Sequence, residues 1–197
     1  MENVAARICR EAGGRVTTNV MVRDMDLARP DVHDTRRLEV VVDGLSILGG
    51  VQLAVDTTVV SALHANGEAR RNAARRDGVA LEAARRRKER TYPELTARGG
   101  RARLIVLGVE VGGRWSTETR SFLSRLAHDR ARSERFLLRK RVEQAWRLRW
   151  GSLLSCAAAR AVAMSLLDLP GSRGSDGVCP LPHDVERDFR HAGLDVG

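Results

Sequence analysis

Aromatic residues and lysines are scarce in this sequence of 197 residues. Phe, Trp and Tyr together make up 4% of the chain, so a folded core has to rest mainly on Val, Leu and Ala. The only lysines are Lys88 and Lys140, so nearly all of the positive charge is carried by arginine.

Cysteines are also few and follow no motif. Cys9, Cys156 and Cys179 are odd in number and unevenly spaced, which argues against a disulfide framework and a zinc knuckle. The five histidines show no metal-ligand spacing either. Residues 1–14 carry charges where a signal peptide would have its apolar region, so we expect an intracellular protein.

A long uninterrupted apolar run is missing as well. The most apolar stretch, residues 151–169, is interrupted by Arg160, so we read it as a core helix and expect no membrane partner.

The charge of the chain is strongly basic. Lys and Arg number 34 against 25 acidic residues, which gives a formal net charge of +9 and a pI near 10.9. The planar guanidinium group binds phosphate bidentately, so this composition favours a polyanionic partner, nucleic acid before others. The alternative interpretation is a proteome that uses Arg where others use Lys.

Hydrophobic periodicity predicts an α/β fold. Strands are expected over 15–22, 37–45, 51–63 and 100–113, and helices over 69–92, from Ser116 or Thr117 onward, and over 134–168. The second and third strands form an antiparallel hairpin, and the first helix crosses over to the last strand. The expected architecture is a mixed β-sheet of about four strands, with a crossover helix and a C-terminal helical pair packed on it.

These elements divide the chain into three parts. We expect an N-terminal segment over 1–14, an α/β domain over 15–168, and a flexible tail rich in Gly, Pro and Ser over 169–197.

An acid stands inside the apolar strand VQLAVDTTVV, where Asp56 is expected to be buried. Since side chains alternate between the faces of a strand, Glu39 or Asp43 of the preceding strand can lie opposite Asp56. Two facing carboxylates repel, and Mg²⁺, which takes one or two carboxylates plus waters, resolves the repulsion. The alternative is that Glu39 and Asp43 lie on an exposed edge and that Asp56 caps a turn.

The crossover helix adds a cation to this set. Helical spacing places Lys88 on the same side as Leu81, Ala84 and Tyr92, pointing inward. From there it could balance the carboxylates and stabilise charge that develops on phosphate. The alternative is a lysine that covers apolar surface with its stem. Glu110, on the last strand, is either a further ligand or a strand-end residue.

Two helices concentrate the positive charge. Residues 69–91 hold nine basic and three acidic residues, and residues 120–150 hold ten and three. We expect nucleic acid to contact a set of basic side chains on these helices: Arg85, Arg86, Arg87, Arg139, Lys140, Arg141 and Arg147. Trp146 and Trp150 could stack on bases, but their spacing favours a place in the core.

Four stretches, taken in order, resemble one protein family. They are LEVVV with Glu39, VDTTV with Asp56 and Thr58, RRKERTY with Lys88 and Tyr92, and LGVEVGGRW with Glu110. The set is similar to the PD-(D/E)XK, restriction-endonuclease-like domains. Within that family it resembles one branch more closely, the C-terminal nuclease-like region that follows the reverse transcriptase in some eukaryotic non-LTR retroelement polyproteins. The similarity covers residues 37–168.

The resemblance implies a metal-dependent endonuclease that cleaves a phosphodiester backbone. Glu39, Asp56 and Lys88 would be catalytic, with Mg²⁺ held by the two acids. Four further residues would support them: Asp43, Thr58, Tyr92 and Glu110. DNA would be the substrate rather than RNA, and the protein would act in the nucleus rather than the cytoplasm.

The sequence departs from the family pattern at three positions. Glu39 stands where the family usually has Asp, and Asp43 competes for that role. Thr58 stands where the wider superfamily has its lysine, so Lys88 would have to substitute from the helix, and Thr91 stands at the position of the second lysine. A degenerate, non-catalytic nucleic-acid-binding module on the same scaffold is therefore the second hypothesis. A third is a protein-interaction domain that uses the long Trp-bearing helix.

Overall fold

The computed structural model describes residues 1–27, 31–64, 66–97 and 99–167. Four strands form one sheet: β1 (Arg15–Met21), β2 (Arg37–Asp43), β3 (Gln52–Val60) and β4 (Ala102–Glu110). Four α-helices accompany it: α1 (Glu2–Glu11), α2 (Val79–Thr91), α3 (Thr117–Ala131) and α4 (Arg139–Leu166). The short 3₁₀ turns η1 (Val22–Asp24), η2 (Ile47–Gly49) and η3 (Pro93–Leu95) complete the described elements.

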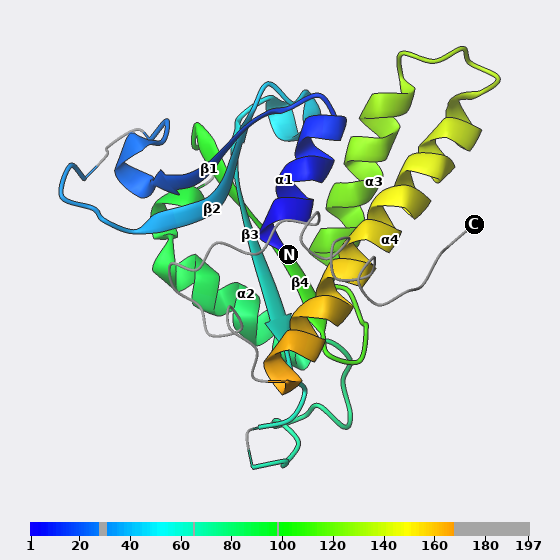
Figure 1. Cartoon of the computed structure of the whole chain (residues 1–197). Coiled ribbons are helices and arrows are strands. Elements are labelled where there is room, and N and C mark those ends of the chain that lie inside the picture. The colour runs from blue at the N-terminus through cyan, green and yellow to red at the C-terminus, as the bar shows by residue number, and fades with distance from the viewer. Residues whose placement is uncertain (28–30, 65, 98, 168–197) are drawn as a thin grey trace, which may run out of the picture. The chain divides into compact units, whose positions relative to one another are not determined.

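The strands are ordered β1-β2-β3-β4 across the sheet. β1 pairs antiparallel with β2, β2 antiparallel with β3, and β3 parallel with β4 through α2. The predicted mixed four-stranded sheet, with its crossover helix and its C-terminal helical pair, is therefore confirmed (Figure 1).

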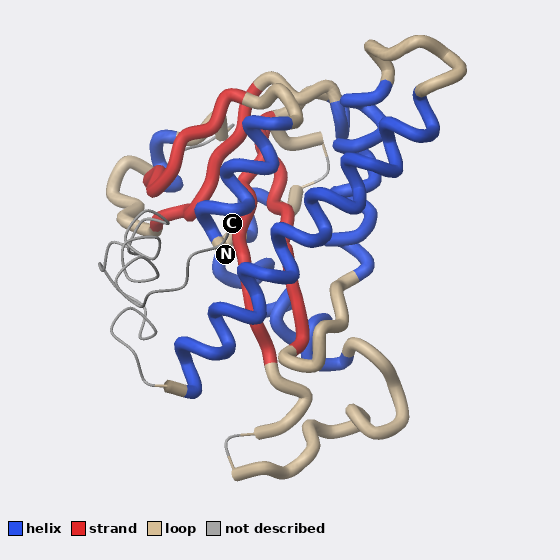
Figure 2. The backbone as a smooth tube through the Cα atoms, turned by 45° about the vertical axis from the view of Figure 1, so that its right-hand side comes forward, coloured by secondary structure: helices blue, strands red, loops and turns tan. Residues whose placement is uncertain are grey.

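Helices cover both faces of this sheet (Figure 2). One face packs against α1, α3 and α4 through Val42, Leu53 and Leu107, with Phe122 and Trp150 from the helices. We call it the three-helix face. The opposite face, which we call the α2 face, packs its own apolar residues against the end of α2 and against η3: Leu38, Val41, Ala54, Leu104 and Val106.

The N-terminal segment 1–14, for which the sequence analysis proposed no secondary structure, forms α1. Its buried residues Ala5, Ile8 and Cys9 belong to the core of the three-helix face. Glu11 at its end accepts hydrogen bonds from Arg149 and from the indole of Trp150 on α4. These donors, the Arg149 side chain first, lower the pKa of Glu11 to about 2. Trp150 is fully buried, so its predicted place in the core is confirmed.

The crossover helix is shorter than the sequence pattern indicated. α2 begins at Val79 rather than at residue 69, because Gly78 adopts a left-handed conformation with φ 76° and ends any continuous helix there. Residues 66–78 instead form turns that extend beyond the C-terminal end of β3 (Figures 1 and 2). The predicted start of α3 is correct, since the Ser116 side chain accepts a hydrogen bond from the Thr119 N–H.

The chain divides into a compact unit over Met1–Arg160 and a second unit over Ala161–Gly197. The described residues of the second unit are the last ones of α4 and Leu167. The tail predicted over 169–197 lies outside the described residues. Within the described part of the chain, no helix combines the length and the apolar character needed to cross a membrane.

Candidate active site

Asp56 lies in the middle of the sheet, on the α2 face of β3. It is 2% exposed, and its neighbours along β3 and on β4 are Ala54 and Val106, both fully packed. A carboxylate in such apolar surroundings costs free energy unless a partner compensates it. Asp56 is one of three buried polar side chains among the described residues, together with Glu110 and Thr119.

Glu39 is the acid that lies near Asp56. The register pairs Val40 with Val55 and Val41 with Ala54, and extending it by one step would bring Glu39 beside Asp56. The alternation of side chains is interrupted at this point, because Leu38 and Val41 both pack on the α2 face and the Glu39 carboxylate bonds to the Thr57 hydroxyl.

The strands β2 and β3 separate at this point, because their pairing ends at Val40 and Val55. Glu39 spans the opening: its Oε2 accepts the backbone N–H of Thr57 at 3.0 Å and the Thr57 hydroxyl at 2.8 Å. The Glu39 carboxylate thus replaces the strand partner that Thr57 would otherwise have. We call this place the β2–β3 fork.

The two acids influence each other electrostatically. Burial raises the pKa of Glu39 above its usual value, and the charge of Asp56 raises it further, while the bonds from Thr57 act in the opposite direction. A raised pKa for one of two neighbouring acids is the expected result when like charges share a poorly hydrated site. A cation near the pair would relieve this repulsion.

Lys88 supplies a cation from α2. Its Nζ lies 2.6 Å from Oδ2 of Asp56, and its side chain is 26% exposed. Ala80, Ala84 and Lys88 recur every four residues, so the same face of α2 that buries the two alanines carries the lysine toward the sheet. The predicted inward direction of Lys88 agrees with this contact.

Tyr92 fixes the end of α2 against β2. Its hydroxyl donates to the backbone carbonyl of Arg37 at 3.0 Å, and the guanidinium of Arg36 lies 5.5 Å from its ring centre. Burial raises the pKa of Tyr92, and the charge of Asp56 raises it further. Because Tyr92 follows Lys88 by one helical turn, this clamp holds the lysine over the fork.

A network around Arg36 strengthens the same connection. Arg36 bonds to Asp34, to Glu94 at 2.8 Å and to the Thr91 carbonyl. Arg36 and Thr57 were not predicted from the sequence. Thr57 is marked in the sequence only by its place next to Asp56. Arg36 lies in a charged loop that has no hydrophobic periodicity and no motif.

Three of the predicted supporting residues lie outside this cluster. Asp43 accepts hydrogen bonds from Gln52 at the other end of β2, four residues from Glu39 and hence about 13 Å along the strand. Glu110 is equally far along β4 from Val106, and it pairs with Arg114 at 3.2 Å. Thr58 shares the face of Asp56 and lies opposite Gly108, two residues further along.

The predicted nucleic-acid contacts fall into two groups. Arg85 is tied to Glu118 at 3.1 Å and to Glu89 at 3.5 Å. The other six side chains are exposed: Arg86, Arg87, Arg139, Lys140, Arg141 and Arg147. Trp146 is half-buried against Trp150, with ring centres 5.0 Å apart, so the tryptophans do not form an exposed stripe on α4.

Glu39 and Asp56 are the two carboxylates at the fork that could hold a magnesium ion. The ammonium of Lys88 contacts Oδ2 of Asp56, whereas Oδ1 has no hydrogen-bond donor among the described residues. Across those residues no three His, Cys, Asp or Glu side chains gather, so the protein would offer two carboxylates at most. Mg²⁺ commonly keeps several waters and takes one or two carboxylates, which matches Glu39 and Asp56.

Comparison with known proteins adds no relative to this geometry. No protein-family model matches the chain, and a search of curated proteins finds no match.

Proposed function

We propose that the chain is a metal-dependent endonuclease domain that cleaves a phosphodiester backbone, with its centre at the β2–β3 fork. The observation that carries the proposal is the buried Asp56 carboxylate. Among the described residues its Oδ1 accepts no hydrogen bond, its charge acts on a second acid, Glu39, and the Nζ of Lys88 from the crossover helix lies 2.6 Å from its Oδ2. Supporting it, the order of hairpin, crossover helix and parallel strand agrees with the core of the PD-(D/E)XK domains that the sequence resembles.

Each residue of the fork has a distinct part in this proposal. Glu39 and Asp56 would hold Mg²⁺, which when bound activates water and stabilises charge on the phosphate. Lys88 balances the charge of the acids, and its partial exposure leaves it able to meet a phosphate oxygen. Tyr92 is a positioning residue, because it anchors the helical turn that carries Lys88.

The polymer would be held by the exposed basic side chains. Arg86 and Arg87 are exposed on α2, and Arg141 and Arg147 are exposed on α4. Arginine contacts with phosphate release counterions, so the affinity for DNA, the expected substrate, should fall steeply with salt concentration.

A plasmid-nicking assay tests the proposal. Supercoiled DNA is incubated with Mg²⁺ and equal amounts of folded wild type, Asp56→Asn, or Glu110→Gln as a matched control. Both substituted acids are buried on the same sheet face, but Glu110 lies outside the cluster. We expect nicking by the wild type and the control, and a loss of at least about 100-fold for Asp56→Asn, since metal ligands are required for the step. Equal nicking by all three proteins would disprove the assignment.

One observation favours a second function, a nucleic-acid-binding module without catalysis. Asp56 is 2% exposed and Lys88 occupies its open side, which is the arrangement of a structural ion pair. This hypothesis predicts DNA binding that is independent of Mg²⁺ and no cleavage by any variant. Electrophoretic mobility shifts with and without Mg²⁺, on the samples used for nicking, distinguish the two functions.

A further inference from the structure

The turn between α3 and α4 exposes three consecutive apolar side chains. Phe136 is 80% exposed, Leu137 87% and Leu138 44%. Single exposed apolar residues are ordinary, but a contiguous group at the end of a projecting hairpin is a feature of interaction surfaces. We call Phe136 and Leu137, the two most exposed, the apolar tip.

The backbone of this turn is supported without those side chains. Glu134 N–H donates to the carbonyl of Ala131, Leu138 N–H to that of Arg135, and the Arg139 side chain to that of Glu134. The cores of the sheet do not use the tip either, since the α3 and α4 residues in them are others, such as Phe122 and Trp150. The turn therefore presents the tip in a preformed shape that folding does not require.

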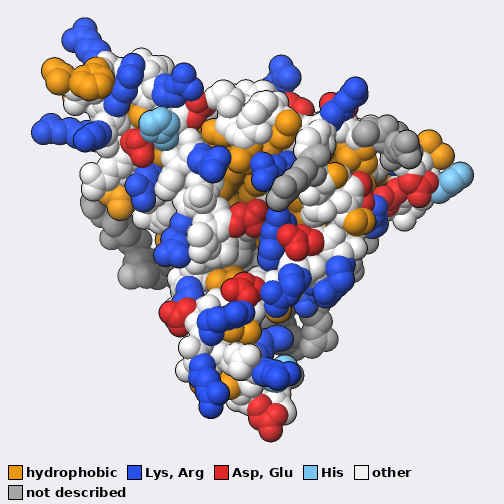
Figure 3. All heavy atoms as spheres, turned by 180° about the vertical axis from the view of Figure 1, so that it is seen from behind, with side chains coloured by type: hydrophobic (Ala, Val, Ile, Leu, Met, Phe, Trp, Pro, Cys, Tyr) orange, Lys and Arg blue, Asp and Glu red, His pale blue; other side chains and the backbone are white. Residues whose placement is uncertain are grey.

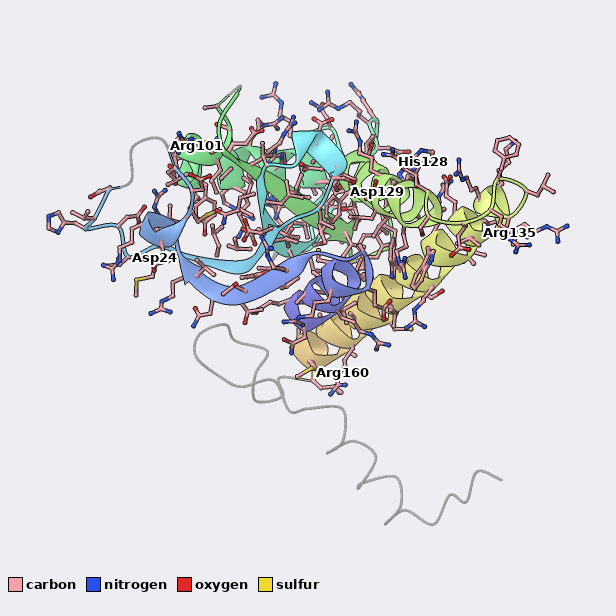
Figure 4. All side chains as sticks on the ribbon, turned by 90° about the horizontal axis from the view of Figure 1, so that it is seen from above. Asp24, Arg101, His128, Asp129, Arg135 and Arg160 are labelled. Carbon is pink, nitrogen blue, oxygen red and sulfur yellow. The ribbon has the colours of Figure 1, made fainter. Side chains whose placement is uncertain are left out.

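Positive charge surrounds the apolar tip. Residues 130–141 contain one acid, the half-buried Glu134, and six basic residues, all exposed: Arg130, Arg132, Arg135, Arg139, Lys140 and Arg141. Figure 3 shows apolar side chains at this end flanked by Lys and Arg, and Figure 4 shows Arg135 at the outer end of the turn. Within the described residues, Arg135, Lys140 and Arg141 form no ion pair, so they are free to meet an anionic partner.

A groove continues the basic surface away from the tip. It lies between α3 and α4, has a volume of about 690 Å³, and is lined by Arg120, Lys140 and Arg147 together with Trp115 and other residues of both helices. A flat lipid surface would contact the tip but not follow a groove between two helices. A nucleic acid, which has regularly spaced phosphates, can contact the tip and also follow the groove. The basic groove therefore favours nucleic acid over an anionic membrane as the partner.

We propose that the apolar tip is a wedge that enters between base pairs of duplex DNA and bends the duplex. Phe and Leu side chains on basic surfaces can partly unstack a base step, and the bend then brings more backbone onto the protein. The basic residues of the turn hold the phosphates on either side of the opened base step. The groove between α3 and α4 receives the DNA strand that continues away from that step. The choice of DNA rests on the proposed function, but the wedge itself needs neither the metal nor the acids of the fork.

Bending of a labelled duplex tests the wedge. A short DNA duplex with a fluorescent donor and acceptor at its ends is titrated with the full chain in the absence of Mg²⁺. We expect the wild type to increase energy transfer between the ends. Phe136→Ala/Leu137→Ala should leave the duplex straight and bind about tenfold more weakly, because it has no ring or branched chain to stack on the opened step.

The control variant is Leu63→Ala/Val111→Ala, which removes apolar side chains that are 48% and 51% exposed elsewhere on the surface. It should bend DNA as the wild type does. Equal bending by the tip variant and the wild type, or no bending by either, would overturn the proposal. Thermal unfolding of both variants confirms that they are folded, as expected for substitutions of exposed side chains.

Two further measurements decide between partners. Sedimentation with vesicles of anionic phospholipid, and sedimentation velocity of the protein alone, are repeated for the wild type and the tip variant. Loss of vesicle binding or of self-association with DNA bending unchanged would overturn the DNA wedge. Asp56→Asn should still bend DNA. Failure of the proposed nuclease activity would therefore leave DNA bending intact, whereas failure of the wedge would abolish the difference in bending between the wild type and the tip variant.

Discussion

The two faces of the sheet use the same strands for different purposes. On the three-helix face, β2 and β3 present Val40, Val42, Leu53 and Val55, all fully buried against apolar helix residues. On the α2 face, the alternate positions of β3 include Asp56, which has Lys88 of α2 against it, and Glu39 lies nearby where β2 leaves β3.

This contrast separates stability from function within one sheet. Apolar burial stabilises the three-helix face directly, by roughly 25 cal/mol for each Å² removed from water. On the α2 face a buried carboxylate costs free energy that Lys88 offsets only in part, since replacing a buried ion pair by apolar residues is often neutral or stabilising. Our proposal assigns this charged cluster a functional role, because apolar residues in its place would stabilise the sheet equally well.

The largest expected effect follows from removing the counter-charge on the α2 face. Lys88→Met should lower the free energy of unfolding by about 3 kcal/mol or more, because the buried Asp56 carboxylate is left uncompensated. Chemical denaturation measures the loss. Asp56→Asn in the same chain should restore most of it, and Lys140→Met, at an exposed lysine, should change stability by less than about 0.5 kcal/mol. Full stability of Lys88→Met alone would show that the ion pair is unimportant.

A substitution on the three-helix face should cost a similar amount without affecting the chemistry. Leu53→Ala removes a fully buried side chain and should lower the free energy of unfolding by about 3 kcal/mol. At a temperature where it remains folded, this variant should nick plasmid as the wild type does. A loss of nicking as large as that of Asp56→Asn would mean that the two faces are not independent.

Titration of Glu39 should give a smaller, pH-dependent effect. Burial, with the charge of Asp56, raises its pKa in the folded state above the usual 4.5, so the folded state keeps a proton that the unfolded state releases. Its contribution to stability therefore declines as the pH rises from about 4.5 through the raised pKa. In urea denaturation across this range, Glu39→Gln should not show that decline.

The difference in unfolding free energy between the wild type and Glu39→Gln, followed across this pH range, reports on Glu39 alone. Burial also raises the pKa of Glu118, but that residue is present in both and contributes equally. Parallel stability curves for the wild type and Glu39→Gln would contradict the assignment of a raised pKa to Glu39.

The smallest effect is expected at the acid that lies on the α2 face but outside the fork. Glu110→Gln loses an ion pair with Arg114, whose side chain is 45% exposed and therefore well hydrated. The free energy of unfolding should change by about 1 kcal/mol or less, as measured by the same denaturation series. A change as large as that of Lys88→Met would show that any buried acid on this face behaves alike.

Alternation along the strands predicted that Glu39 or Asp43 would lie near Asp56 but could not choose between them. The structure places Asp43 at the other end of β2, where it accepts hydrogen bonds from Gln52. The inward direction of Lys88 followed from helical periodicity. The start of α2 could not be predicted from composition, since residues 69–77 favour a helix locally, whereas the left-handed Asn72 and Gly78 interrupt it.

The fork itself depends on tertiary structure. Where β2 leaves β3, the Glu39 carboxylate replaces a strand partner for Thr57. No local sequence pattern predicts that the two strands separate at this point. The clamp of Arg36 on Tyr92 is likewise formed by residues that are 56 positions apart. Such contacts form only when secondary-structure elements pack together, so hydrophobic periodicity within one element cannot predict them.

Metal binding at the fork is the claim on which the account depends, and calorimetric titration with Mg²⁺ in the absence of DNA measures it. The wild type and Glu110→Gln should each bind one Mg²⁺ per chain, and Asp56→Asn should bind none at the same concentrations. Equal heats for Asp56→Asn and the wild type, or no binding by any of the three proteins, would contradict a magnesium site formed by Glu39 and Asp56.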